Sequence, residues 1–164
     1  KRVGQILAVP VHVSGVTGRN VLRSTSVERR LVNGVRGSLK NTDDEWTFWK
    51  KNDSIAVTID VGARKRLGKV SLGYLNHFGL GIHKPQKVEV WLSDNDVHYW
   101  KATEQTFGTD EIFAEGRFTE EMEFVFKDVA RYVRVIMKGA GKCPEHHVRP
   151  GLETQIYLDE VLIE

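Results

Sequence analysis

The feature that most constrains this chain is the alternation of apolar and polar residues in several separate runs along it. Residues 54–61, 70–74, 88–92 and 122–126 each place an apolar side chain at every second position. A period of two puts these side chains on one face of a β-strand, whereas a helix needs apolar residues three and four positions apart. The sequence therefore predicts a chain built from β-strands, each with one buried face.

Further strands are predicted at residues 6–13, 131–137 and 154–163, which are rich in β-branched and aromatic side chains. Turn-forming residues separate the runs: Asn33-Gly34, Gly62, Lys84-Pro85, Asp94 to Asp96, and Gly139 to Pro144. The strongest helical pattern, at residues 109–115, is one or two turns long. Short strands without alternating β-α-β units predict an all-β fold, an antiparallel β-sandwich or distorted jelly roll.

Composition limits what this domain binds. The 164 residues suit one core, so we expect residues 1–164 to form a single domain. The formal net charge is only +2 and the Lys and Arg are scattered, which argues against nucleic acid as a partner. No apolar run approaches the ~20 residues that cross a bilayer. The single cysteine, Cys143, excludes an internal disulfide.

Three segments, in their order along the chain, resemble the factor V/VIII type C (discoidin-like) domain family. The motifs that carry this resemblance are L-V-N-G-V-R-G-S at 31–38 followed by Trp46, V-T-I-D-V-G at 57–62, and A-R-Y-V-R-V at 130–135 with D-E-V at 159–161. The R-G-S form of the first motif, together with C-P-E-H-H at 143–147, is most similar to one subgroup. That subgroup is the family 32 carbohydrate-binding modules appended to bacterial β-N-acetylhexosaminidases and other glycoside hydrolases.

The resemblance implies a galactose-binding-domain-like jelly roll that has no catalytic activity and binds sugars with loops at one end. It also implies that the chain is the C-terminal fragment of a larger secreted, periplasmic or cell-surface enzyme. The expected partners are the catalytic domain of that enzyme and a glycan ending in a galactose- or N-acetylhexosamine-like residue. Animal relatives bind phospholipid or protein instead, so the fold alone does not choose the ligand.

The resemblance further implies a structural Ca²⁺ ion. Its ligands would be side-chain oxygens of Asn33 and Ser38, the backbone carbonyls of Arg36 and Asp159, and the carboxylate of Glu160. Such a mixture of carbonyl, hydroxyl and carboxylate oxygens suits Ca²⁺. The alternative is that Asn33-Gly34 is a tight turn whose amides Glu160 caps.

Loop aromatics are the side chains that hold a sugar ring, because the apolar face of a pyranose stacks on them. Trp46 and Trp49 flank Phe48 in a stretch that is otherwise polar. We expect Trp46 or Trp49 to be the stacking platform. If the stretch is extended, Trp46 and Phe48 share one face and Trp49 lies on the other, so one of the three aromatics would instead fill the core.

Polar contacts to the sugar are expected from two further loops. His77 and Phe78 follow a predicted strand and would form a rim of the site, and His146 and Arg149 lie in a proline-bounded loop near the C-terminus. Imidazole and guanidinium groups donate hydrogen bonds to hydroxyls, and Arg149 could also take a carboxylate or sulfate. The alternative is that the second loop is simply solvated.

Four other interpretations of the sequence compete with sugar binding. Cys143, His146 and His147 suit Zn²⁺, but a structural zinc site needs four ligands, and the sequence shows no second cysteine and no paired histidine cluster. A glycosidase would need a carboxylate pair, and no nucleophile motif or phosphate loop accompanies the acidic residues. An interaction domain would show an apolar patch around Trp91. Membrane recognition would need protruding apolar loops, of which the sequence shows few.

Overall fold

A computed structural model describes residues 12–17, 31, 34–50 and 54–164, and for residues 12–17 it describes the backbone only. Its strands are β1 (His12–Thr17), β2 (Thr47–Trp49), β3 (Ile55–His77), β4 (Lys87–Ser93), β5 (Trp100–Thr106), β6 (Arg117–Lys138) and β7 (Ile156–Ile163). Two short helices, η1 (Phe78–Leu80) and α3 (Thr109–Ile112), lie between them. The strand pairs are antiparallel, so the all-β class predicted from the alternation is confirmed.

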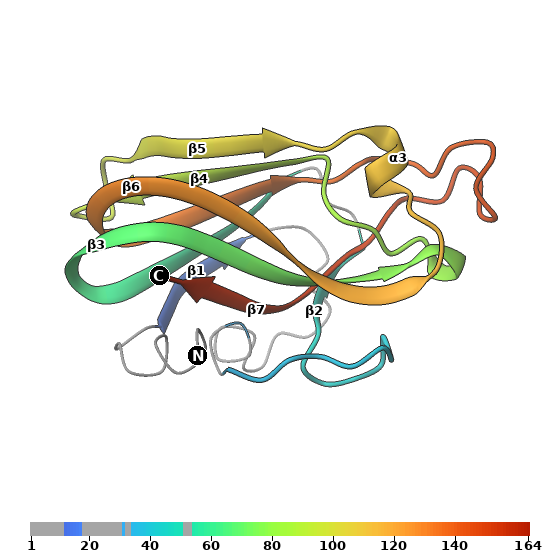
Figure 1. Cartoon of the computed structure of the whole chain (residues 1–164), viewed down its shortest axis with the longest axis horizontal. Helices are drawn as coiled ribbons and strands as arrows, with labels where there is room; N and C mark the ends of the chain where they lie inside the picture. Colours follow the sequence, from blue (N-terminus) through green and yellow to red (C-terminus); the bar gives the residue numbers. More distant parts are fainter. Residues whose placement is uncertain (1–11, 18–30, 32–33, 51–53) are drawn as a thin grey trace.

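Two long strands organise the molecule. β3 has 23 residues and β6 has 22, and they pair with each other along almost their whole lengths. Register shifts between Asp60 and Lys65, and between Leu67 and Lys69, mark the bend of this pair. Gly62 at the bend has φ 91°, a left-handed conformation that favours glycine. Each long strand therefore runs through one layer, bends, and returns through the other (Figure 1).

The remaining strands extend the two layers on either side of this pair. β7 pairs with the second half of β3, and β2 pairs with β7. β1 pairs with the first half of β3, while β4 pairs with the second half of β6 and β5 with β4. The strand order is β2-β7-β3-β6-β4-β5, with β1 added on β3. The hydrogen-bonded sheet thus folds over on itself into a sandwich.

The long strands differ from the sequence-based expectation. The runs at 54–61 and 70–74 were expected to be separate strands, and so were those at 122–126 and 131–137, but each pair belongs to one bent strand. The bulges let hydrogen bonding continue through a bend that the sequence marks only by Gly62. The helix expected at 109–115 is shorter, and of the strand expected at 6–13 only residues 12 and 13 are among those described.

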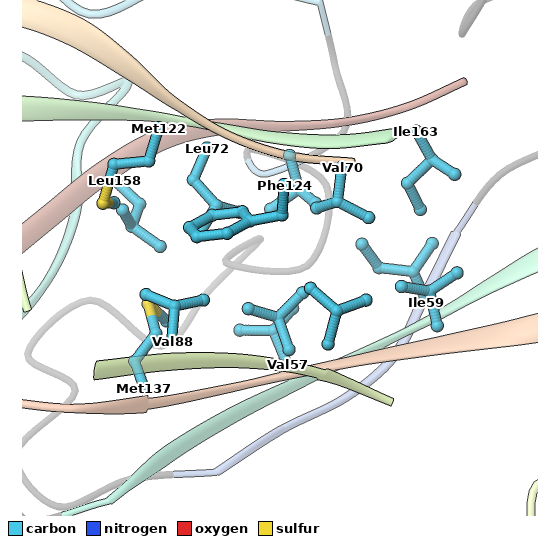
Figure 2. Close-up of a cluster of buried hydrophobic side chains, with 14 of the residues drawn as sticks. Val57, Ile59, Val70, Leu72, Val88, Met122, Phe124, Met137, Leu158 and Ile163 are labelled. Carbon is cyan, nitrogen blue, oxygen red and sulfur yellow. The ribbon is translucent and has the colours of Figure 1, made fainter. Parts of the chain in front are cut away.

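The main core lies between the layers. Val57, Val88 and Met137 from one layer face Leu72 and Phe124 from the other, and all five are at most 4% exposed (Figure 2). These are the apolar positions of the alternating runs, so burial of their side chains from water provides the main driving force for the sandwich. The predicted inward faces are therefore confirmed.

A second, smaller cluster packs on the outside of one layer. It consists of Trp46, Leu75, Ile82 and Tyr157. The indole N–H of Trp46 donates to the carbonyl of Ser38 at 2.9 Å, and the same ring lies against Gly37. The loop that carries the R-G-S motif is thereby fixed to the sheet through one tryptophan.

Gly37→Ala should destabilise the fold. A Cβ atom there would stand 2.3 Å from Cε2 of Trp46, and that ring is fully buried and cannot move aside. Such overpacking costs about 1–3 kcal/mol, so the Tm should drop by several degrees. Gly108→Ala is the matched control, because an added Cβ there meets nothing within 4 Å. Equal melting temperatures for the two variants would contradict this packing.

Candidate binding site at the loop end of the sandwich

Three loops meet at one end of the sandwich, where β3 ends and β6 both begins and ends (Figure 1). They comprise residues 78–86, 107–116 and 139–155. Backbone hydrogen bonds join them: Phe78 N–H donates to Gly116 O at 3.1 Å, and His83 N–H to Gln155 O at 3.0 Å. The loops therefore form one preorganised surface.

This surface contains a pocket of about 440 Å³. Its lining combines two aromatic rings with hydrogen-bonding groups: Phe78, Thr109, Asp110, Phe113, Ala114, Glu115 and His146. Ring faces of this kind stack on apolar C–H surfaces, and carboxylates accept hydrogen bonds from hydroxyl or amine groups. The pocket is therefore suited to a small polyhydroxylated ligand.

Two of the six predicted ligand-binding residues line this pocket, namely Phe78 and His146. Arg149 lies in the same group of loops, where its Nε–H donates to Gly79 O at 2.5 Å and ties two loops together. His77 is half-buried, and its Nδ1 atom has no hydrogen-bond partner among the described residues. Arg149 thus supports the pocket, and His77 does not appear among its lining residues.

The prediction that Trp46 or Trp49 is the stacking platform is wrong. Trp46 and Trp49 are both 0% exposed, so neither ring offers a face to a ligand. The expected alternation holds, because Trp46 belongs to the small outer cluster and Trp49 to the main core. Side chains pack against both faces of β2. The polar residues that surround these tryptophans in the sequence do not reveal this burial. Phe48 is the partly exposed member of the trio, and it stacks on Tyr157 with ring centroids 4.6 Å apart.

Most of the pocket-lining residues were not predicted from the sequence. Asp110, Phe113 and Glu115 come from α3 and the turn after it. Their segment was considered only as a short helix. The available signal was a phenylalanine among acidic residues and glycines, the same type of signal that directed attention to Trp46 and Trp49.

A second polar feature is the pair of carboxylates Asp159 and Glu160 on β7, both 0% exposed. Asp159 accepts hydrogen bonds from Arg36 Nε at 2.9 Å and from the backbone N–H of Gly37 at 2.8 Å. The backbone N–H of Gly34 lies close enough to Glu160 to lower its pKa, as the alternative of a capped turn requires, but no hydrogen bond of normal geometry reaches either carboxylate oxygen within the described part of the chain. Burial, reinforced by the charge of Asp159, raises the pKa of Glu160 to about 8.

These residues can be compared with the expected Ca²⁺ ligands. The unpartnered buried oxygens of Glu160 fit a hard cation, because a buried carboxylate without a partner is costly. The expected side-chain ligand of Ser38, its Oγ atom, accepts the backbone N–H of Lys40 at 3.2 Å. The side chain of Arg36, whose backbone carbonyl was the expected ligand, binds Asp159 and Glu121. Asn33 lies outside the described residues. Of the expected Ca²⁺ ligands, Glu160 is therefore the one whose environment best suits the ion.

The architecture is a β-sandwich with a pocket at its loop end, and solved structures share this fold. A Clostridium perfringens module, CpGH89CBM32-5, in complex with GalNAc-β-1,3-galactose, is 12% identical with a TM-score of 0.56, and the alignment covers 96% of each chain. The CBM32 of AlyQ in complex with 4,5-unsaturated mannuronic acid is 15% identical with a TM-score of 0.55, covering 93% of this chain and 95% of that one.

Chitosan-binding module 1 of a Paenibacillus sp. IK-5 chitosanase/glucanase is likewise 15% identical, with a TM-score of 0.53 and coverage of 95% of this chain and 94% of that one. No protein-family model matches the sequence, and no curated protein matches it. The chain therefore has the fold of family 32 carbohydrate-binding modules, which confirms the resemblance drawn from its motifs. Within the described residues, no helix is long and apolar enough to cross a membrane.

The buried Glu160 predicts an unusual dependence of stability on pH in the presence of a chelator. Its folded pKa of about 8 exceeds the ordinary value of 4.5, so between these pH values the folded chain holds a proton that the unfolded chain releases. The contribution of Glu160 to the free energy of unfolding should therefore fall as pH rises from 5 to 8, by a few kcal/mol at most since one pKa unit is about 1.4 kcal/mol. The lowered pKa values of His83 and His147 act in the opposite direction below their ordinary value of 6.5, so the effect of Glu160 is isolated by comparison with a variant.

Glu160→Gln removes the titrating group, so the stability of the wild type relative to this variant should fall as pH rises from 5 to 8. Thermal unfolding of both proteins at several pH values measures the effect. A constant difference in Tm between the two proteins from pH 5 to 8 would show that Glu160 does not titrate in this window.

Proposed function

We propose that this chain is a non-catalytic carbohydrate-binding module that uses the loop-end pocket to bind a terminal sugar residue. The observation that carries the proposal is the lining of that pocket, in which Phe78 and Phe113 lie beside Asp110, Glu115 and His146. Aromatic rings would stack on the ring C–H groups, and the polar side chains would bond the hydroxyls. The shared fold with modules whose structures contain sugars supports this proposal.

The small size of the pocket indicates how tightly a sugar would bind and what that binding would achieve. A small open site makes few contacts, and little free energy remains after the costs of association, so affinity for a single sugar is weak. Tethering compensates by raising the effective concentration of the attached partner. We therefore place the module beside a glycoside hydrolase catalytic domain of the same chain, in a secreted, periplasmic or cell-surface enzyme. A galactose- or N-acetylhexosamine-like residue is the proposed ligand.

We also propose that Ca²⁺ binds at Glu160, with the loop of residues 34–38 contributing backbone oxygens. The unpartnered oxygens of Glu160 and the Oδ1 atom of Asp159 support this assignment. Arg36 and Gly37 already join the loop of residues 34–38 to Asp159 on β7. The ion would add a second link between this loop and β7, through Glu160.

The alternative of an interaction domain finds no support around Trp91. Its indole N–H donates to Glu89 at 2.8 Å, and the ammonium group of Lys101 lies 5.7 Å from the ring centroid. Charged side chains thus occupy the outer surface beside this tryptophan, where an interaction domain would present an apolar patch.

A glycan array with the isolated module tests the sugar proposal. We expect binding to a restricted set of terminal sugars, and at least tenfold weaker binding by Asp110→Asn and by His146→Ala, since each removes a hydrogen-bonding group from the pocket. Both residues are exposed, so their variants should keep the wild-type Tm. Glu153→Gln, an exposed change in the same group of loops but not in the pocket lining, is the matched control. A blank array from folded protein would refute the proposal.

Calcium should raise the Tm of the wild-type chain by several degrees at pH 8, because it binds the folded state through Glu160. The shift should be smaller at pH 5, where a proton competes for the same carboxylate. Glu160→Gln should show no shift, whereas Glu153→Gln should respond like the wild type. A full calcium response in Glu160→Gln would place the ion elsewhere.

A further inference from the structure

A cluster of three metal-ligating side chains lies behind the pocket. His83, Cys143 and His147 are buried, and one ligand atom of each lies within 4.8 Å of the others. The Nε2 atoms of the two histidines are 3.0 Å apart. His83 comes from the loop after β3, and the other two residues from the loop between β6 and β7, so only the fold brings the three together.

The hydrogen bonds around the cluster fix the protonation of both imidazole rings. The amide nitrogen of Asn76 donates to the carbonyls of Ala114 and Gly116, each at 3.0 Å, so its oxygen faces His83. His83 Nδ1–H donates to that oxygen at 3.0 Å, which leaves a lone pair on Nε2. His147 Nδ1 accepts from the backbone N–H of Arg149 at 2.9 Å, so the proton of the neutral ring is on Nε2.

A single proton therefore lies between the two Nε2 atoms, donated by His147 and accepted by His83. Both rings are neutral near pH 7, because burial, reinforced by the neighbouring His147, lowers the pKa of His83 to about 4 and burial also lowers the pKa of His147. Two neutral imidazoles and a thiol facing one point are the ligand types that Zn²⁺ selects.

We propose that His83 Nε2, His147 Nε2 and Cys143 Sγ bind a Zn²⁺ ion, with the fourth coordination position filled by water. The separation of the two nitrogens supports this, since ligands at Zn–N distances of 2.0–2.1 Å in a tetrahedral site stand roughly 3.4 Å apart. For the two nitrogens the shift from 3.0 Å is a few tenths of an ångström. The three ligand atoms lie within 4.8 Å of one another, so the thiol must also move toward the ion. The contact between His83 and Asn76 is the outer hydrogen bond that orients a ligating imidazole.

The site is held in place without the ion. Cys143 N–H donates to Leu152 O at 2.8 Å, and His147 N–H to Pro144 O at 3.0 Å, so the turn that bears both ligands is closed by backbone bonds. The ring of Phe78 packs against His147 in a tilted arrangement with centroids 4.0 Å apart, and the ring of Phe113 meets His83 edge to face with centroids 5.1 Å apart. These two rings also line the pocket, so they separate the cluster from the ligand surface.

Binding requires two proton movements. The Cys143 thiol, whose pKa is raised by burial, releases its proton to solvent and ligates as a thiolate. The proton on His147 moves from Nε2 to Nδ1, so the ring stays neutral and Nε2 gains the lone pair that ligates. The hydrogen bond from Arg149 N–H to Nδ1 must then break, and the loop around Arg149 adjusts. One proton is released for each ion bound.

Zinc retention by the purified chain tests this proposal. Protein stripped with a chelator is loaded with Zn²⁺ in excess Ca²⁺, desalted, and analysed for zinc. We expect close to one ion per chain, and at least a tenfold loss in Cys143→Ser. His98→Ala, an exposed histidine in a distant turn, is the matched control and should retain the full amount. His146→Ala should also retain it, because His146 lies outside the cluster.

Co²⁺ provides a readout in the wild-type chain that does not depend on any variant folding. It should give a thiolate-to-cobalt charge-transfer band, which is absent from Cys143→Ser in a sample whose circular dichroism matches the wild type. Failure to retain zinc, equal retention by Cys143→Ser, or cobalt binding without the thiolate band would each overturn the proposal. None of these results depends on sugar binding.

Discussion

The pairing of β3 with β6 is the interaction on which the rest of the structure depends. Both strands bend and return, so each contributes to both layers and both of its ends lie at the same end of the sandwich. His77 pairs with Arg117 at that end, and Lys138 pairs there with Lys87. Every loop that follows β3, precedes β6 or follows β6 must therefore emerge together. The pocket and the histidine cluster both follow from this single constraint.

The buried polar groups of the described residues fall into two classes, those with hydrogen-bond partners and those without. Asn76, His83 and His147 form a chain in which each donor faces an acceptor, so their burial costs little. Glu160 is the opposite case, because its carboxylate has no hydrogen-bond partner among the described residues. A satisfied network can stand alone or exchange one proton for a metal ion. A buried carboxylate without a hydrogen-bond partner is stable only when it binds a proton or a cation. Burial therefore raises the pKa of Glu160.

The aromatic residues show how far local sequence can identify a binding surface. A tryptophan among charged neighbours predicts exposure, and Trp46 met that description. It is nevertheless fully buried, because a loop from earlier in the chain and the Tyr157 ring of β7 lie over it. Phe113 has similar neighbours and lines the pocket. The difference lies in which distant segment covers each ring, and no local pattern encodes that.

The sequence by itself determined the central strands and their buried faces, because a period of two records which side of a strand meets the core. It did not predict β2 or β5, which lack a clear run of alternating apolar residues. The motifs at 31–38, 57–62 and 130–135 likewise indicated the fold that the solved structures share. The tertiary structure alone decided that the alternating runs join into two bent strands. It also decided that His83 joins Cys143 and His147, which are 60 or more positions away in the sequence. Contacts between such distant residues depend on where the bends direct the loops, and hydrophobic periodicity contains no information about that.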